Sequence, residues 1–194
     1  VDKNHKTSVD HLYAVGECAS MYHGANRLGG NSLLAAIYSG HVAANAINTL
    51  AETKDCPNFE TYISEQEQVL EKRLQSKSRF SAVHVRHEIA KLLNDCLGIT
   101  RTEEKLLEGI KSVDYYISVS EKLIYDIDVS PYIGYSLKPM ILLARAILTS
   151  ALSRKETRGS HIREDYPQRS DEFALCSVCD YKNGEHHISY IKED

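Results

Sequence analysis

The residues most able to do chemistry lie close together, between Glu17 and Leu34. This run holds one acid, one arginine and three glycines just before an apolar segment. Glycines let the backbone approach a flat ring closely, an arginine binds a carboxylate with two hydrogen bonds, and the start of a helix offers N–H groups to negative charge. The combination predicts redox chemistry on a carboxylic acid beside a flat cofactor.

Two motifs carry a resemblance to a known family. Residues 23–34, which follow residues 12–17, resemble the segment that closes the flavin pocket in the succinate dehydrogenase and fumarate reductase flavoproteins. Residues 144–145 and 154–167 resemble the arginine-rich signature that comes later in the same family. Both motifs stand in the family's order, with a helical region between them. The resemblance implies FAD as the cofactor and a four-carbon dicarboxylate as the substrate.

The resemblance also assigns roles within the first motif. Arg27 matches the arginine that clamps one substrate carboxylate, and its planar fork explains why a lysine would not replace it. His23 is a second candidate at the same end, although a histidine beside a glycine is more often structural. Glu17 matches an acid that binds sugar hydroxyls of FAD. The positions that match contacts with the flavin ring, where a helix start stabilises negative charge, are Asn31, Ser32 and Leu33.

The implied reaction is hydride transfer between the flavin and a substrate carbon, with a proton moved by an arginine outside this chain. The sequence has no G-x-G-x-x-G after a strand, the motif that places a dinucleotide pyrophosphate on a helix N-terminus. We therefore expect a C-terminal fragment that lacks the ADP half of the FAD site and the capping domain. Such a fragment would hold no catalytic residue, would not bind FAD alone and would be inactive. In the whole protein, electrons would pass to or from an iron–sulfur subunit or another electron-transfer partner.

Two alternatives stay open. L-aspartate oxidase is similar in both motifs and oxidises an amino acid rather than a dicarboxylate. A different class is a non-catalytic helical docking module for an electron-transfer partner, in which the flavin motif is a relic. FAD binding by the full-length protein would separate these, because a relic should not bind flavin.

Composition narrows the classes of partner and compartment. The net charge is −4, and the 27 acids and 23 bases are spread along the chain, which argues against nucleic acid. Five cysteines fit a reducing compartment, so we expect a cytoplasmic protein that reaches the cytoplasmic membrane only through a partner. The most apolar segment, residues 137–152, is interrupted by Lys138, Pro139 and Arg145, and we expect no direct membrane insertion.

The sequence predicts a mainly α fold in three parts. Residues 1–50 would be the C-terminal piece of an α/β FAD-binding domain, residues 51–158 a three- to four-helix antiparallel bundle, and residues 159–194 an irregular tail. In the first part we expect a strand over residues 11–16 and a helix that runs to about Leu50. Asn31 or Ser32 would cap this helix.

Helical periodicity places the bundle helices. Asp55 would start a helix that covers residues 59–77, and Gly98 would end the next one. Thr100 with Glu103 suggests a capping box, residues 128–134 a turn, and residues 136–157 the last helix. Apolar stripes are expected on the last three helices: Val85, Ile89, Leu92, Leu93 and Cys96; Leu106, Ile110, Val113, Ile117 and Ile124; and Met140, Ile141, Ala144, Ile147, Leu148, Ala151 and Leu152. The tail would hold one short strand at residues 187–191.

Two further groups in the C-terminal part have chemical side chains. Mixed charges over residues 154–165 predict a lattice of salt bridges and hydrogen bonds that ties the last helix to the flavin domain. Cys176 and Cys179 form a single C-x-x-C, which lacks the second pair of ligands that a zinc or iron–sulfur site needs. We therefore expect two reduced cysteines and no metal.

Overall fold

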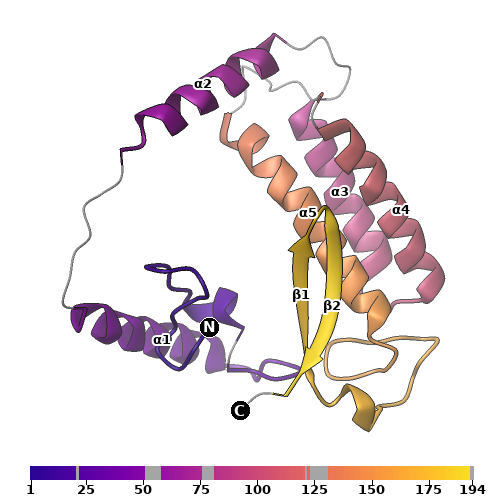
Figure 1. Ribbon diagram of the computed structural model, residues 1–194. Coiled ribbons are helices and arrows are strands. Elements are labelled where there is room, and N and C mark those ends of the chain that lie inside the picture. The colour runs from indigo at the N-terminus through magenta and orange to yellow at the C-terminus, as the bar shows by residue number, and fades with distance from the viewer. Residues whose placement is uncertain (21, 51–57, 76–80, 121, 123–130, 193–194) are drawn as a thin grey trace. The chain divides into compact units, whose positions relative to one another are not determined.

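The computed structural model describes residues 1–20, 22–50, 58–75, 81–120, 122 and 131–192. The chain divides into two compact units, Val1–Pro57 and Asn58–Asp194 (Figure 1). It is mainly helical with one small two-stranded sheet, which confirms the fold class expected from the sequence.

The first unit is built on helix α1, Asn31–Asn48, against which the 3-10 helix η1, Gly16–Ala19, packs. The buried face of α1 has small residues, Ala35, Ser39 and Ala43, and small side chains allow this close approach. The strand expected over residues 11–16 is wrong. This segment makes one isolated antiparallel bridge, between Lys6 and Tyr13, and a single bridge is too short a ladder to make a strand.

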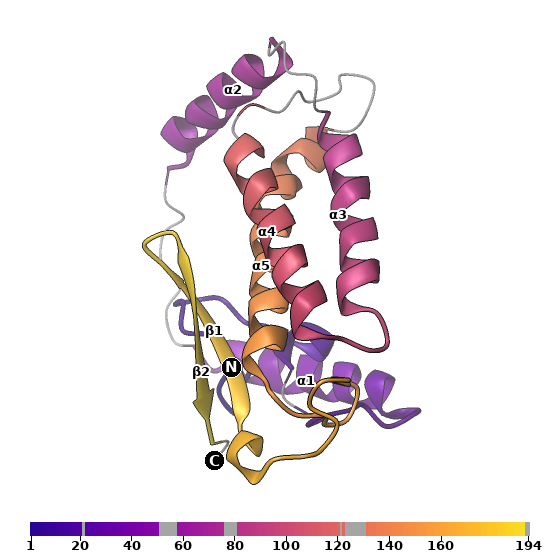
Figure 2. The ribbon, with the colours of Figure 1, turned by 90° about the vertical axis from the view of Figure 1, so that its right-hand side faces the viewer.

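Among the described residues, the second unit has four α-helices and one 3-10 helix: α2 (Glu60–Leu74), α3 (Ala82–Leu97), α4 (Glu103–Ser120), α5 (Pro131–Ser153) and η2 (Asp171–Phe173). Helices α3, α4 and α5 pack side by side as a three-helix bundle (Figure 2). The hydroxyl of Tyr135 on α5 donates to the Gln66 carbonyl of α2 at 3.1 Å. The expected bundle is therefore present.

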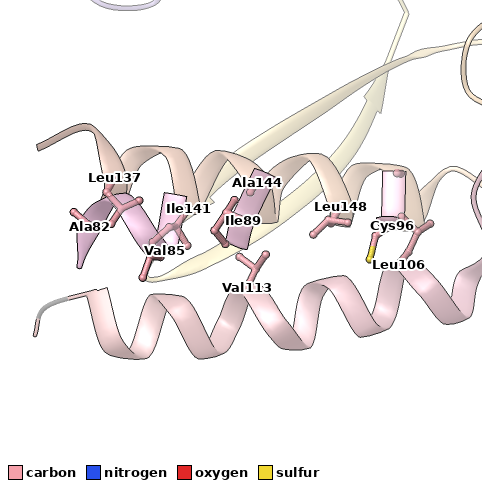
Figure 3. Close-up of a cluster of buried hydrophobic side chains, with 11 residues drawn as sticks. Ala82, Val85, Ile89, Cys96, Leu106, Val113, Leu137, Ile141, Ala144 and Leu148 are labelled. Carbon is pink, nitrogen blue, oxygen red and sulfur yellow. The ribbon is translucent and has the colours of Figure 1, made fainter. Parts of the chain in front are cut away.

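The core of the bundle lies where α3, α4 and α5 meet. Ile89 from α3, Val113 from α4 and Ile141 from α5 are all fully buried there. Figure 3 shows these side chains pointing toward one another from the three helices. The apolar stripes expected on the three helices supply this core, except Ile147, which is partly exposed, and Ile124, which lies outside the described residues.

Three helix ends differ from the expectation. α1 begins after Gly30, whose φ of 82° is left-handed, so neither Asn31 nor Ser32 is the cap residue. At α4 the capping hydroxyl belongs to Thr102, which accepts from the Lys105 N–H at 3.4 Å, and not to Thr100. α5 begins at Pro131, within the segment expected to turn, because proline is preorganised for the first helical position.

The other helix boundaries follow the sequence more closely. Gly98 ends α3, and its N–H donates to the Asn94 carbonyl at 3.2 Å. α5 ends at Ser153, before the expected residue 157. The expected helix start at Asp55 and the predicted end of α2 at residue 77 lie outside the described residues.

The tail holds more regular structure than the single strand expected at residues 187–191. Strands β1, Cys176–Lys182, and β2, Glu185–Ile191, pair antiparallel from Cys176 opposite Ile191 to Lys182 opposite Glu185. Asn183 and Gly184 join them with φ angles of 54° and 86°, which suit a tight hairpin turn. The hairpin contacts α5, so it is part of the second unit.

Candidate functional site

The glycine-rich loop leads directly into the first turn of α1. Gly30 precedes the helix in a left-handed conformation, and a Cβ there would meet no atom within 4 Å, so conformation alone requires the glycine. Asn31, Ser32 and Leu33 therefore form the first turn, where backbone N–H groups have no acceptor within the helix. The Asn31 N–H donates to the Leu28 carbonyl at 3.3 Å. This turn can receive an anionic or polar ring edge.

Arg27 lies over this first turn. Its Nη1 donates to the Ser32 Oγ at 2.6 Å, and the Arg27 side chain is exposed. Ser32 takes one of the five N–H donors of the guanidinium, so the fork keeps further donors for a carboxylate. The structure thus brings together Arg27 and Ser32, the expected substrate-binding and cofactor-binding residues.

Glu17 is held by the packing of η1 on α1. The N–H of Gly16 donates to the buried Ser39 Oγ at 2.8 Å, and this hydroxyl donates to the Ala36 carbonyl at 3.0 Å. A Cβ on Gly16 would lie 3.5 Å from the Cβ of Ala36, and its φ of 69° favours glycine. The Glu17 carboxylate is exposed, as an acid that binds a ligand hydroxyl must be.

His23 is half-buried in the loop between these groups. Across the described residues, no hydrogen bond or ion pair joins His23 to Arg27 or Glu17. Its expected place beside Arg27 in the site is thus supported by sequence proximity alone.

An apolar surface adjoins the first turn of α1. The side chains of Leu33, Leu34 and Ile37 are 74%, 68% and 73% exposed. Exposed apolar side chains in one patch mark a surface that binds another molecule or segment. The site therefore combines a helix start, an apolar wall, a carboxylate and a guanidinium, which fits a flat cofactor with an anionic edge.

Two residues of the same unit were missed by the sequence analysis. They are His5 and Tyr22, and Tyr22 directly precedes His23 in the sequence. His5 is fully buried, and its Nε2 lies 2.5 Å from the Tyr22 hydroxyl. A single histidine in a polar turn belongs to no recognisable sequence motif. The spacing between residues 5 and 22 also matches no known pattern, so the sequence held no signal for this pair.

The second motif forms the expected lattice at the C-terminal end of α5. Glu156 is fully buried and accepts from Arg154 Nη1 at 2.7 Å, Arg158 Nε at 2.8 Å and the Ser170 N–H at 2.9 Å. Burial alone would raise the pKa of Glu156, but these hydrogen bonds outweigh it and lower the pKa to about 2. The bonds given by the structure tie α5 to the loop after it, within the second unit, and the expected tie to the flavin domain stays a prediction.

Arg154 also reaches the base of the hairpin. Its Nη2 donates to the Leu175 carbonyl at 2.7 Å and the Ser177 Oγ at 2.8 Å, and its guanidinium lies over the Phe173 and Tyr190 rings. These contacts involve the protein's own groups, so they support an architectural role for Arg154.

Cys176 and Cys179 both lie on β1, three residues apart. Side chains three apart on a strand point to opposite faces, so the two thiols do not share one side. No cluster of three metal-ligating side chains is present in the part of the chain that the structure describes.

One helix among the described residues, Tyr132–Ser153, has the length and composition of a membrane span. It is one of the three helices of the bundle, and its Leu137, Ile141 and Leu148 are buried in the core shared with α3 and α4. Core helices of water-soluble bundles meet the same criterion, so this feature is weak evidence for a membrane segment.

Comparison with known proteins finds flavoproteins over both units of the chain. Residues 86–193 match the family model described as the fumarate reductase flavoprotein C-terminus, and residues 1–33 match an FAD binding domain. The succinate dehydrogenase flavoprotein subunit of Bacillus subtilis is 29% identical over 185 residues, which cover 89% of this chain and 31% of that protein. L-aspartate oxidase of Pyrococcus furiosus is 30% identical over 94% of this chain and 32% of that protein.

The fold points the same way. The FrdA chain of E. coli quinol fumarate reductase superposes with a TM-score of 0.78 and 28% identity, over 97% of this chain and 34% of FrdA. The chain spans about a third of the length of the curated relatives it matches. Since the C-terminal family model covers more than half of the chain, the chain belongs to the succinate dehydrogenase and fumarate reductase flavoprotein family.

Proposed function

We propose that this chain is the C-terminal part of an FAD-dependent oxidoreductase that interconverts succinate and fumarate. The observation that carries the proposal is the Arg27–Ser32 hydrogen bond, which places a guanidinium at the first turn of α1. Relatives named succinate dehydrogenase and fumarate reductase flavoprotein subunits support the substrate class. The whole protein would use electron-transfer partners such as an iron–sulfur subunit and reach a membrane only through them.

FAD fits the residues of the first unit. The Glu17 carboxylate would accept from sugar hydroxyls, and the first turn at Asn31, Ser32 and Leu33 would contact the flavin edge. When bound, FAD supplies hydride transfer. Exposed Leu33 and Ile37 would pack on a flat ring and exclude water from it, which strengthens nearby electrostatic contacts. Residues 1–50 would thus complete an FAD-binding domain, residues 51–158 would form its helical bundle domain and residues 159–194 the tail.

Arg27 would bind one carboxylate of the dicarboxylate and hold the central carbons against the cofactor. A planar fork makes two parallel hydrogen bonds to a carboxylate, so it fixes orientation as well as charge. Ser32 would hold the guanidinium from behind, and His23 would assist at the same end. The group that moves a proton lies outside this chain, so we infer that the chain alone has no turnover.

The test is steady-state turnover of the full-length flavoprotein, loaded with FAD, with reduced viologen dye and fumarate. Arg27→Ala should lower kcat/KM for fumarate by roughly two orders of magnitude, because it removes a charged partner of a desolvated carboxylate. Arg86→Ala, which removes an exposed arginine of α3, is the matched control and should have little effect. Equal kcat/KM values for Arg27→Ala and the control would contradict the proposal.

L-aspartate oxidase is the second candidate, supported by the Pyrococcus furiosus match across 94% of the chain. The same protein should therefore be assayed with L-aspartate. Aspartate turnover without fumarate turnover would move it to the oxidase branch. Failure to bind FAD would favour the non-catalytic docking module.

A further inference from the structure

His5 joins the N-terminal turn to the segment that leads into Glu17. The Ala14 N–H donates to the His5 carbonyl at 3.1 Å, and the ring Nδ1 lies 3.1 Å from the Ala14 carbonyl oxygen. A carbonyl oxygen only accepts, so Nδ1 carries the proton and Nε2 of the neutral ring is an acceptor. Because His5 is fully buried, its ring is fixed in this orientation by its surroundings.

The acceptor nitrogen of that ring, Nε2, faces Tyr22, which begins the loop that carries Arg27. Nε2 lies 2.5 Å from the Tyr22 hydroxyl, which therefore donates to it. Partial desolvation of the hydroxyl, and next the neighbouring Tyr38, raises the pKa of Tyr22, so the hydroxyl keeps its proton at neutral pH. The Tyr22 ring also meets Tyr38 of α1 edge-on, with centroids 6.1 Å apart.

Tyr22 is thus an anchor at one end of the loop, and α1 is the anchor at the other. From Tyr22 to Gly30 the loop is exposed except for half-buried His23. Arg27 lies near the middle and contacts Ser32 at the far end. An exposed loop has low local stability, so attachments at its two ends limit how far Arg27 can move.

We propose that Tyr22 and His5 are positioning residues, whose hydrogen bond holds the loop so that Arg27 meets the substrate carboxylate in register with the Glu17 segment. This inference rests on the proposed function of Arg27. It gives His5 and Tyr22 a role in substrate binding that acts through Arg27 and not through direct contact with substrate or cofactor. The link spans three segments that are separate in sequence: the N-terminal turn, the approach to Glu17 and the loop.

The first variant is Tyr22→Phe in the FAD-loaded full-length flavoprotein. It removes the hydroxyl and keeps the ring against Tyr38. Loss of one hydrogen bond should raise KM for fumarate about threefold to tenfold. We expect kcat to change less, with FAD content and the flavin absorption spectrum unchanged. Tyr38→Phe keeps the same ring contact and is the matched control, for which KM should stay at the starting value.

Two substitutions of His5 give a rescue test. The amide of His5→Gln reaches where Nε2 lies and should restore a partner for Tyr22, so KM should stay near the starting value. The shorter His5→Asn can serve Ala14 only and should raise KM as Tyr22→Phe does. The double variant Tyr22→Phe with His5→Asn should be no worse than either single variant, because both remove the same bond.

A readout independent of activity is amide hydrogen exchange of residues 23–30 in the loaded protein. Tyr22→Phe should speed exchange there and leave the α3–α5 bundle unchanged. Unchanged KM and exchange in Tyr22→Phe, while Arg27→Ala still lowers kcat/KM for fumarate as expected, would overturn this inference and leave the proposed function intact. If the unaltered protein turns over only L-aspartate, the proposed function fails, and the same KM comparison is made with L-aspartate. Equal values there would overturn the positioning role as well.

Discussion

Arg163 binds Asp165 through one edge of its guanidinium: Nε donates to Oδ1 and Nη2 to Oδ2, each at 2.8 Å. The third nitrogen, Nη1, donates to the carbonyls of Ala151 at 2.9 Å and Leu152 at 3.2 Å in the last turn of α5. Asp165 in turn accepts from the Glu103 N–H at the start of α4. A fully buried arginine therefore joins the end of one bundle helix to the beginning of another.

Removal of this arginine should destabilise the second unit strongly. Arg163→Met leaves Asp165 without its partner and takes a donor from the last turn of α5, so the free energy of unfolding should fall by about 3–5 kcal/mol. Urea denaturation followed by circular dichroism measures this. Arg169→Met, at an exposed arginine in the same loop, should change stability by less than about 0.5 kcal/mol. Similar losses for both variants would contradict the architectural role of Arg163.

The same lattice makes stability depend on acid pH. The pKa of Glu156 falls from 4.5 to about 2 in the folded chain, and that of Asp165 from 3.8 to about 2, chiefly through its hydrogen bond with Arg163. As pH falls, the unfolded chain therefore binds protons before the folded chain does. The stabilisation is full above about pH 4.5 and is lost as pH falls toward 2.

Urea denaturation at several pH values between 6 and 2.5 tests this. Glu156→Gln should lower stability at pH 6, because a buried neutral amide replaces a carboxylate bound by two arginines. It should also flatten the fall below pH 4.5. Glu164→Gln, at an exposed neighbour, should keep the full pH dependence. A parallel pH profile for Glu156→Gln would contradict the assignment.

The sequence predicted those parts of the fold whose signal lies within one short segment. The apolar stripes of α3, α4 and α5 needed only helical periodicity, and Ile89, Val113 and Ile141 lie in the core as expected. The sequence predicted the strand at residues 187–191, which is part of β2, but missed β1 although Asn183 and Gly184, a strong hairpin signal, follow it. In β2 the residues alternate between exposed and half-buried, whereas β1 shows no regular alternation, and its place in the sheet follows from its pairing with β2 and its packing on α5.

The candidate site divides in the same way. Arg27 and Ser32 were found because they belong to one contiguous motif, and the structure joins them. His5 and Tyr22 could not be found, because their contact depends on a turn that brings residues 17 positions apart together. Burial of His5 follows from that tertiary arrangement and leaves no periodic trace in the sequence.

Acidification should also loosen the hairpin tip. Arg145 Nη1 lies 3.2 Å from His186 Nδ1, and since a guanidinium only donates, Nδ1 must be unprotonated. Arg145 also pairs with Asp114 of α4, and the Tyr181 ring and His187 lie beside His186. Burial, and next the Arg145 charge, lowers the pKa of His186 below its usual 6.5, despite the opposing effects of Asp114 and a hydrogen bond with the Leu142 backbone.

As pH falls, His186 therefore takes up a proton in the unfolded or detached hairpin before it does in the folded chain. The stability that the Arg145–His186 contact adds is full above pH 6.5 and is lost as pH falls below it. Hydrogen exchange of residues 181–187 should therefore be faster at pH 5.5 than at 7.5, after correction for the intrinsic rate. His186→Gln keeps an acceptor for Arg145 and should remove the pH dependence. His187→Gln, at the exposed neighbour, should retain it. Identical protection at both pH values in the starting chain would contradict this prediction.

The last prediction concerns Gly29 and Gly30, the two glycines before α1. Both have room for a side chain, but their backbone conformations differ. A Cβ at Gly29 or at Gly30 meets no atom within 4 Å, but only Gly30 has a positive φ, 82°. Gly30→Ala should therefore strain the start of α1 by about 1 kcal/mol, whereas Gly29→Ala should not. Amide exchange in residues 35–37, whose N–H groups donate to carbonyls of the first turn, should become about fivefold faster for Gly30→Ala alone. Since Arg27 contacts the same turn through Ser32, equal exchange in both variants would show that the loop, and not the glycine conformation, sets where the helix begins.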